Sequence, residues 1–169
     1  MRALIERNDT PEDLRIAALD AFERDRASMD DATWMRNIYS KVDNPSVRAA
    51  LASAVGRIGG ESNDQWLLGL SKNEDESIDV RLKALRRVSQ TVDIGNLVKF
   101  YDNVSARPLR EEIINALGNR AEPQAIDKLL DIVKNSTDPQ VRRSAISQLT
   151  RKKDPRATQA LLDIIDKKP

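Results

Sequence analysis

The stretch 137–149 reads TDPQVRRSAISQL, and the stretch 43–55 reads DNPSVRAALASAV. Both contain a short polar residue, a proline, a Val-Arg pair and then apolar residues at helical spacing. Two such similar phrases about ninety residues apart indicate an internal repeat. We therefore expect further copies of the same pattern in the rest of the sequence.

The pattern occurs five times, each time as Val or Leu followed by Arg. The pairs are Leu14-Arg15, Val47-Arg48, Val80-Arg81, Leu109-Arg110 and Val141-Arg142, with successive arginines 33, 33, 29 and 32 residues apart. Positions three, four and seven after the Arg are also apolar. The seventh position, for example, holds Phe22, Val55, Val88, Leu117 and Leu149. Together with the residue before the Arg, these positions form one apolar stripe on a helix.

Capping signals stand where these helices should begin. Thr10-Pro11, Asn44-Pro45 and Asp138-Pro139 place a capping side chain before a proline at the first helical position, and Ser77 can cap the third copy. The fourth copy, SARPLREE, is irregular because its proline is shifted by one residue. Gly59-Gly60 and Gly118-Asn119 supply residues that end helices.

A second set of helices alternates with the first. We expect them over 30–42, 63–73, 93–104, 122–136 and 154–168. No stretch has the alternating pattern of a strand, so the sequence predicts an all-α solenoid. We expect a single domain over 1–169, which is also compatible with a fragment of a longer protein. Its repeats span about 1–24, 29–60, 62–90, 93–120 and 122–153, and a terminal helix follows over 154–168.

The pattern Asp-Pro-x-Val-Arg-x-x-Ala-Ile, followed by a loop and Asp-Pro-x-Ala, resembles the HEAT repeat. It is most similar to the bacterial HEAT-like form that also occurs in phycobilin lyases. The resemblance extends from about residue 9 to 168. It implies a right-handed α-α superhelix of about five helix pairs, in which the Val-Arg helices line the concave face. It implies no particular activity, because HEAT arrays serve many purposes.

The recurring arginine has a structural interpretation. The resemblance implies that it is a ladder residue that bonds a carboxylate or carbonyl of the neighbouring repeat, and a planar five-donor side chain suits that role. The predicted ladder consists of Arg15, Arg48, Arg81, Arg110 and Arg142. Trp34 and Trp66 occupy nearly equivalent slots in the other helices, and we expect them to be core residues rather than a stacking platform.

Composition excludes several kinds of chemistry. The chain has 169 residues and contains neither Cys nor His, which removes disulfides, thiol nucleophiles, Cys or His zinc ligands and imidazole catalysis. No carboxylate pair, Gly-rich phosphate loop or nucleophile–base arrangement stands at a meaningful spacing. We therefore expect no enzyme, no cofactor and no metal. No apolar run is long enough for a signal peptide or a membrane span. The sequence thus predicts a soluble chain, cytoplasmic or, as part of an exported parent, periplasmic.

Charge indicates where a partner would bind. The net charge is +1, but the five Val-Arg segments together carry +7 and the remainder −6. Such a basic face attracts anionic partners. On the side of these helices opposite the apolar stripe or at its rim lie Arg57, Lys83, Arg86, Arg87, Glu112, Asn115, Asn119 and Arg151. The leading hypothesis is a non-catalytic scaffold that binds an acidic protein segment there.

Three other functions stay open at this stage. The first is nucleic-acid binding, as in HEAT-like alkylpurine DNA glycosylases, although the aromatics here fall in the other set of helices. The second is a lyase activity like that of the phycobilin-attaching relatives. The third is an assembly role, because the first repeat lacks a polar cap, so that dimerisation through the amino-terminal end is one expectation.

Overall fold

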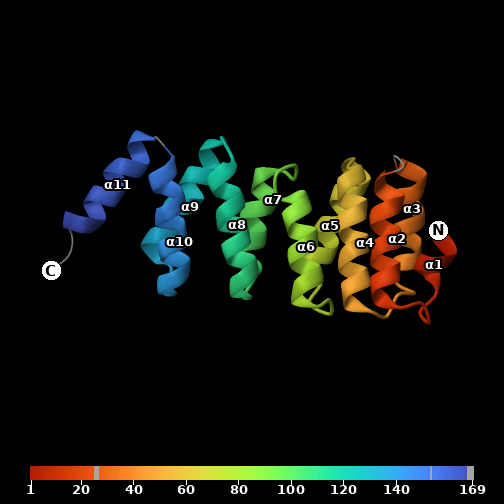
Figure 1. Cartoon of the computed structure of the whole chain (residues 1–169). Helices are drawn as coiled ribbons and strands as arrows, with labels where there is room; N and C mark the ends of the chain where they lie inside the picture. The colour runs from red at the N-terminus through yellow and green to blue at the C-terminus, as the bar shows by residue number, and fades with distance from the viewer. Residues whose placement is uncertain (25–26, 153, 167–169) are drawn as a thin grey trace. The chain divides into compact units, whose positions relative to one another are not determined.

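The computed structural model describes residues 1–24, 27–152 and 154–166, and the chain forms two compact units, residues 1–91 and 92–169. Every regular element in the described part of the chain is an α-helix (Figure 1). The predicted all-α class is therefore confirmed. The single continuous domain and the handedness of its superhelix stay predictions.

Unit 1 is built from three helix pairs. Its helices are α1 (Arg2–Glu6), α2 (Glu12–Arg24), α3 (Met29–Tyr39), α4 (Pro45–Ile58), α5 (Glu61–Lys72) and α6 (Ile78–Val88). Each odd-numbered helix packs against the even-numbered helix that follows it, and α4 lies between α2 and α6 (Figure 1). This is the stacked-pair arrangement that the sequence predicts. We call the surface formed by α2, α4 and α6 the even-helix face of unit 1.

Unit 2 repeats the arrangement with two pairs and a further helix. Its helices are α7 (Ile94–Asn103), α8 (Arg107–Asn119), α9 (Pro123–Asn135), α10 (Pro139–Arg151) and α11 (Pro155–Asp166). Here α8 packs against α10, and α9 contacts both α7 and α11. The surface of α8 and α10 is the even-helix face of unit 2. Of the terminal helix and last repeat expected from the sequence, positions 153, 167 and 168 lie outside the described residues.

Three of the four side-chain caps that the sequence predicts are present among the described residues, and Thr10 is the exception. Asn44 Oδ1 accepts the backbone N–H groups of Ser46 and Val47, at 2.9 and 3.1 Å, and Asp138 Oδ1 caps α10 in the same way. Ser77 Oγ accepts the Val80 N–H at the start of α6. These bonds satisfy N–H groups that have no partner within the helix.

The predicted apolar stripe forms the core of both units. Val47, Leu51 and Val55 are fully buried in unit 1, and Leu109, Ile113 and Leu117 are fully buried in unit 2. Leu14 differs: it is 53% exposed, whereas the residue before the Arg is fully buried in the other four copies. The side chain of Phe22 lies outside the described residues.

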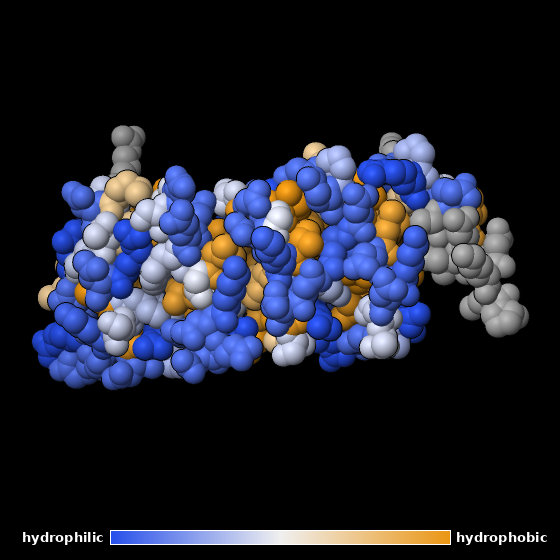
Figure 2. Space-filling view, turned by 180° about the vertical axis from the view of Figure 1, so that it is seen from behind, coloured by the Kyte–Doolittle hydropathy of each residue, from blue (hydrophilic) through white to orange (hydrophobic). Residues whose placement is uncertain are grey.

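In each unit, the surface opposite the even-helix face is mainly hydrophilic. Figure 2 shows this surface mostly in blue, with hydrophobic residues exposed in several smaller areas. Helices α3 and α5 of unit 1 and α7 and α9 of unit 2 face the viewer there, because they stand behind the even-numbered helices in Figure 1. Charged and polar residues thus cover this side as well, and the predicted partner site depends on which charges gather on the even-helix faces.

Candidate functional site

A hollow of about 330 Å³ lies in the even-helix face of unit 1. Helices α2, α4 and α6 all contribute to its lining, which consists of Ile16, Asp20, Ser46, Ala49, Ala50, Ser53, Arg57, Asp79, Lys83 and Arg87. Small residues of α4 form the floor, because Ala49 and Ser53 are buried. The charged side chains are exposed and surround this floor. The hollow therefore presents a small apolar base within a charged rim.

Gly56 places Arg87 at the hollow. A Cβ atom added to Gly56 would lie 2.7 Å from both Cβ and Cγ of Arg87, far inside van der Waals contact. Only glycine allows α4 and α6 to come this close. The stem of Arg87 consequently crosses α4, while its guanidinium remains at the surface.

The rim of the hollow carries charges of both signs. Arg57, Lys83 and Arg87 supply three positive charges, and Asp20 and Asp79 supply two negative ones. The Arg57 guanidinium pairs with Asp20 at 3.7 Å, and both side chains are well exposed. An exposed pair at this distance contributes little and is screened by salt. The pair with Asp20 therefore adds little to the stability of the hollow's rim.

Unit 2 has a similar close approach with a different side chain. A Cβ atom added to Gly118 would lie 2.6 Å from Cδ of Gln148, so Gln148 crosses α8 as Arg87 crosses α4. Its Nε2 donates to Asn115 Oδ1 at 2.7 Å, and Arg151 donates to its Oε1. The even-helix face of unit 2 thus presents an amide pair beside one cation.

The structure brings together some of the predicted binding residues. Three of them, Arg57, Lys83 and Arg87, line the same hollow, and Arg86 is exposed on α6. The predicted residues of unit 2 lie on α8 and α10. There Asn115, Asn119 and Arg151 are exposed and Glu112 is half-buried. That these eight residues bind a partner stays a prediction.

Four of the five predicted ladder arginines bond a carbonyl just before their own helix. Their Nε groups donate at 2.6–3.1 Å to a carbonyl at or just after the end of the preceding odd-numbered helix. The donor and acceptor pairs are Arg15 with Ile5, Arg48 with Val42, Arg81 with Ser71 and Arg110 with Val104. The bond therefore lies within a helix pair rather than between pairs. Arg48 also reaches the next pair, through Glu76. Arg142 is exposed, and it makes no such bond with any described residue.

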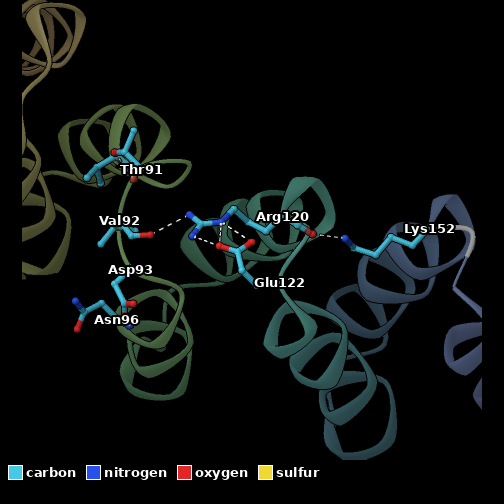
Figure 3. A network of polar contacts seen from close by, with 8 residues as sticks. Thr91, Val92, Asp93, Asn96, Arg120, Glu122 and Lys152 are labelled. Carbon is cyan, nitrogen blue, oxygen red and sulfur yellow. Dashed lines mark hydrogen bonds and ion pairs between the residues drawn. The ribbon is translucent and has the colours of Figure 1, made fainter.

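Bonds between successive pairs in unit 2 come from residues that sequence reasoning missed. Arg120 Nη1 donates to the Val92 carbonyl at 2.9 Å, and Lys152 Nζ donates to the Arg120 carbonyl (Figure 3). The signal was present in the sequence, since Arg120 and Lys152 each stand ten residues after the repeat arginine. Arg120 also holds Glu122 at 2.5 Å, and this hydrogen bond lowers the pKa of the Glu122 carboxyl to about 2.

Five of the six aromatic residues lie in odd-numbered helices, and the sixth is Phe22 on α2. Trp34 and Trp66 are half-buried against the core of unit 1, and Trp66 meets Tyr39 edge-on with centroids 5.2 Å apart. The Trp34 indole N–H donates to Glu6 at 2.7 Å. The described lining of the hollow contains no aromatic side chain. Stacking of bases there is thus unsupported.

Metal and membrane chemistry find no support in the described part of the chain. No group of three or more acidic side chains is placed there to hold a metal ion. None of the described helices combines the length and apolarity needed to cross a bilayer.

Helix pairs stacked through equivalent buried positions define an α-helical repeat protein. A family model described as HEAT repeats matches residues 96–169. That match confirms, over those residues, the resemblance to HEAT repeats that the sequence carries. A comparison with curated proteins found no match to the chain. HEAT repeats generally act as protein-interaction scaffolds and are typically non-catalytic.

Proposed function

We propose that this protein is a non-catalytic interaction scaffold that binds an acidic protein segment on the even-helix face of unit 1. The observation that supports the proposal is the hollow across α2, α4 and α6, with Arg57, Lys83 and Arg87 at its rim. Three cations on two adjacent helices match an acidic segment that crosses the helices. Complementary charge of this kind steers encounter and selects the partner.

The small floor of the hollow defines what such a segment must contain. Ala49, Ala50 and Ser53 leave room for a short apolar side chain, while the rim cations meet carboxylates on either side. Asp20 and Asp79 repel a uniformly acidic chain. We therefore expect a segment in which acidic residues flank a small apolar residue.

Fluorescence anisotropy with the full chain and a labelled peptide of this kind tests the proposal. Lys83→Glu should weaken binding at least about tenfold, the effect of turning one attractive contact repulsive. Lys99→Glu is the matched control, because Lys99 is an equally exposed lysine on α7 of unit 2. The proposal fails if the two variants bind alike, or if affinity is indifferent to salt between low and moderate ionic strength.

Nucleic acid is the competing anionic partner, and the same assay distinguishes it. Labelled duplex and single-stranded DNA should bind more weakly than the acidic peptide at moderate salt, because the hollow offers cations without stacking aromatics. Tighter binding of DNA, with the same loss in Lys83→Glu, would replace the proposed partner with nucleic acid.

A further inference from the structure

The two units contain equivalent clusters around a buried tyrosine. Tyr39 and Tyr101 each stand nine residues before the repeat arginine, Arg48 in unit 1 and Arg110 in unit 2. The arginine Cζ atom lies 5.1 Å from the ring centroid in unit 1 and 5.6 Å in unit 2. In both units the arginine Nε donates to the carbonyl three residues after the tyrosine, at 2.6 and 2.7 Å. The same local framework is therefore built twice.

In unit 1 a carboxylate completes the cluster. Glu76 immediately precedes Ser77, the N-cap of α6. Both of its carboxylate oxygens lie 3.3 Å from Arg48 Nη1, and its side chain is only 8% exposed. Arg48 thus donates from Nε to a backbone carbonyl and from Nη1 to a carboxylate.

In unit 2 the equivalent position holds no acid. The residue before Asp138, the N-cap of α10, is Thr137. Beside it lies a pocket of about 220 Å³, and Tyr101, Arg110 and Thr137 are among the residues that line it. Among the described residues no carboxylate forms an ion pair with Arg110, whose one hydrogen bond is that of Nε. Its terminal N–H donors therefore have no acceptor like the one that Glu76 gives Arg48.

The other charges of the pocket are paired with one another. Lys128 lies 5.2 Å from the Tyr101 centroid and bonds Asp102 and Asp131, at 2.5 and 2.7 Å. Burial lowers the pKa of Lys128, but the hydrogen bonds to the two acids outweigh this effect and leave the pKa above its ordinary value, so the lysine stays charged. Asn135 donates to the second oxygen of Asp131 at 2.6 Å. The acids are thus engaged with Lys128 and Asn135, and Arg110 is the cation of the pocket that has no carboxylate partner among the described residues.

We propose that this pocket of unit 2 binds a carboxylate group, whose oxygens accept hydrogen bonds from the terminal nitrogens of Arg110 as Glu76 does from Arg48. The volume falls below that of pockets for drug-sized ligands, so the carboxylate belongs to a group about as large as one side chain. A free small carboxylate and a glutamate side chain of a peptide share this chemistry. The proposal is independent of the site on unit 1.

Titration of the full chain, followed by NMR of the Arg110 Nε–H and the Thr137 amide, tests this pocket. Glutarate and acetyl-Glu-amide are the two carboxylate probes, and acetyl-Gln-amide and methylammonium are the controls. We expect saturable shifts with the carboxylates alone. A response to glutarate without acetyl-Glu-amide assigns the pocket to a free carboxylate, and the reverse assigns it to a peptide. An equal response to either control overturns the proposal.

Variants at position 137 distinguish an effect on carboxylate binding from an effect on folding. Thr137→Glu supplies the acid that unit 1 already has, so it should keep the fold and weaken glutarate binding at least about tenfold. Thr137→Val has nearly the same shape and should bind within about twofold of the wild type. The reciprocal Glu76→Thr should make the Arg48 Nε–H respond to glutarate. Unchanged affinity in Thr137→Glu overturns the assignment.

Discussion

At the scale of single residues, the repeat arginine solves a problem at the end of a helix. The last carbonyls of a helix lack partners and carry its partial negative charge, which a guanidinium neutralises and bonds. Arg81 illustrates this, since its Nε reaches the Ser71 carbonyl at 3.1 Å while the side chain is 8% exposed. In four of the five helix pairs, the arginine thus ties the end of the odd-numbered helix to the even-numbered helix that follows it.

The contribution of the repeat arginine to the free energy of unfolding should differ from copy to copy. Arg81→Met leaves the Ser71 carbonyl without its donor, so we expect a loss of about 1–3 kcal/mol in the free energy of unfolding. Arg142→Met is the matched control, because Arg142 is exposed, and it should change the free energy by less than about 0.5 kcal/mol. Urea unfolding followed by circular dichroism measures both. Equal losses would contradict this account.

Glu122 should make the stability of unit 2 depend on acid pH. The Arg120 hydrogen bond lowers its pKa from the ordinary 4.5 to about 2 in the folded chain. A depressed folded pKa gives stability that is present above about pH 4.5 and is lost as the pH falls through about 2. Relative to Glu122→Gln, the wild type should therefore have the higher urea midpoint at pH 6, and this advantage should disappear near pH 2. Glu74→Gln corrects for the loss of one surface carboxylate. A constant difference would refute the linkage.

At the scale of elements, the spacing of neighbouring even-numbered helices depends on single glycines. Gly56 on α4 faces Arg87 on α6, and Gly118 on α8 faces Gln148 on α10. The two contacts differ in what could move. At Gly56 the nearest atom is the Arg87 Cβ, which is fixed by its backbone, whereas at Gly118 it is the end of a flexible side chain. The α4–α6 contact is therefore the more sensitive one.

Alanine at three glycines should rank these contacts. Gly56→Ala forces α4 and α6 apart, and we expect it to destabilise the chain by about 1–3 kcal/mol. Gly118→Ala should cost less, because Gln148 can turn away at the expense of its bond to Asn115. Gly69→Ala meets nothing within 4 Å inside α5 and should stabilise by about 0.5–1 kcal/mol. Thermal unfolding measures all three, and a stabilising Gly56→Ala would disprove the close contact.

The elements were more predictable than their contacts, and the reason is physical. Asn44, Ser77 and Asp138 cap helices through bonds to residues two or three positions away, so the local sequence contains the whole interaction. The role of Gly118 depends on Gln148, which comes from another helix, and its place near the end of α8 resembles a helix stop. The bond from Arg120 to Val92 spans 28 residues, so the nearby sequence does not identify the acceptor, and only the recurrence of a cation ten residues after the repeat arginine indicates the donor.

At the scale of the whole molecule, the candidate site was predictable only in its charge. Counting residues identifies basic helices, and Lys83 and Arg87 do lie exposed on one of them. The count cannot show that Asp20 pairs with Arg57 in the same hollow, because this contact joins different repeats. The unit 2 pocket escaped the sequence for a similar reason. The absence of an acid beside Arg110 becomes apparent only when Thr137, which precedes the N-cap of α10, is compared with Glu76, which precedes the N-cap of α6.

The exposed leucine of the first repeat leads to a prediction about association. Leu14 is 53% exposed and Leu4 on the adjacent α1 is 48% exposed, although Leu14 occupies a position that is fully buried in the other repeats. Covering both leucines removes apolar surface from water. We predict concentration-dependent self-association that Leu14→Glu reduces, measured by sedimentation velocity. Ile78→Glu, at a singly exposed apolar residue of α6, is the control and should sediment like the wild type. A wild-type chain that stays monomeric at high concentration would contradict the prediction.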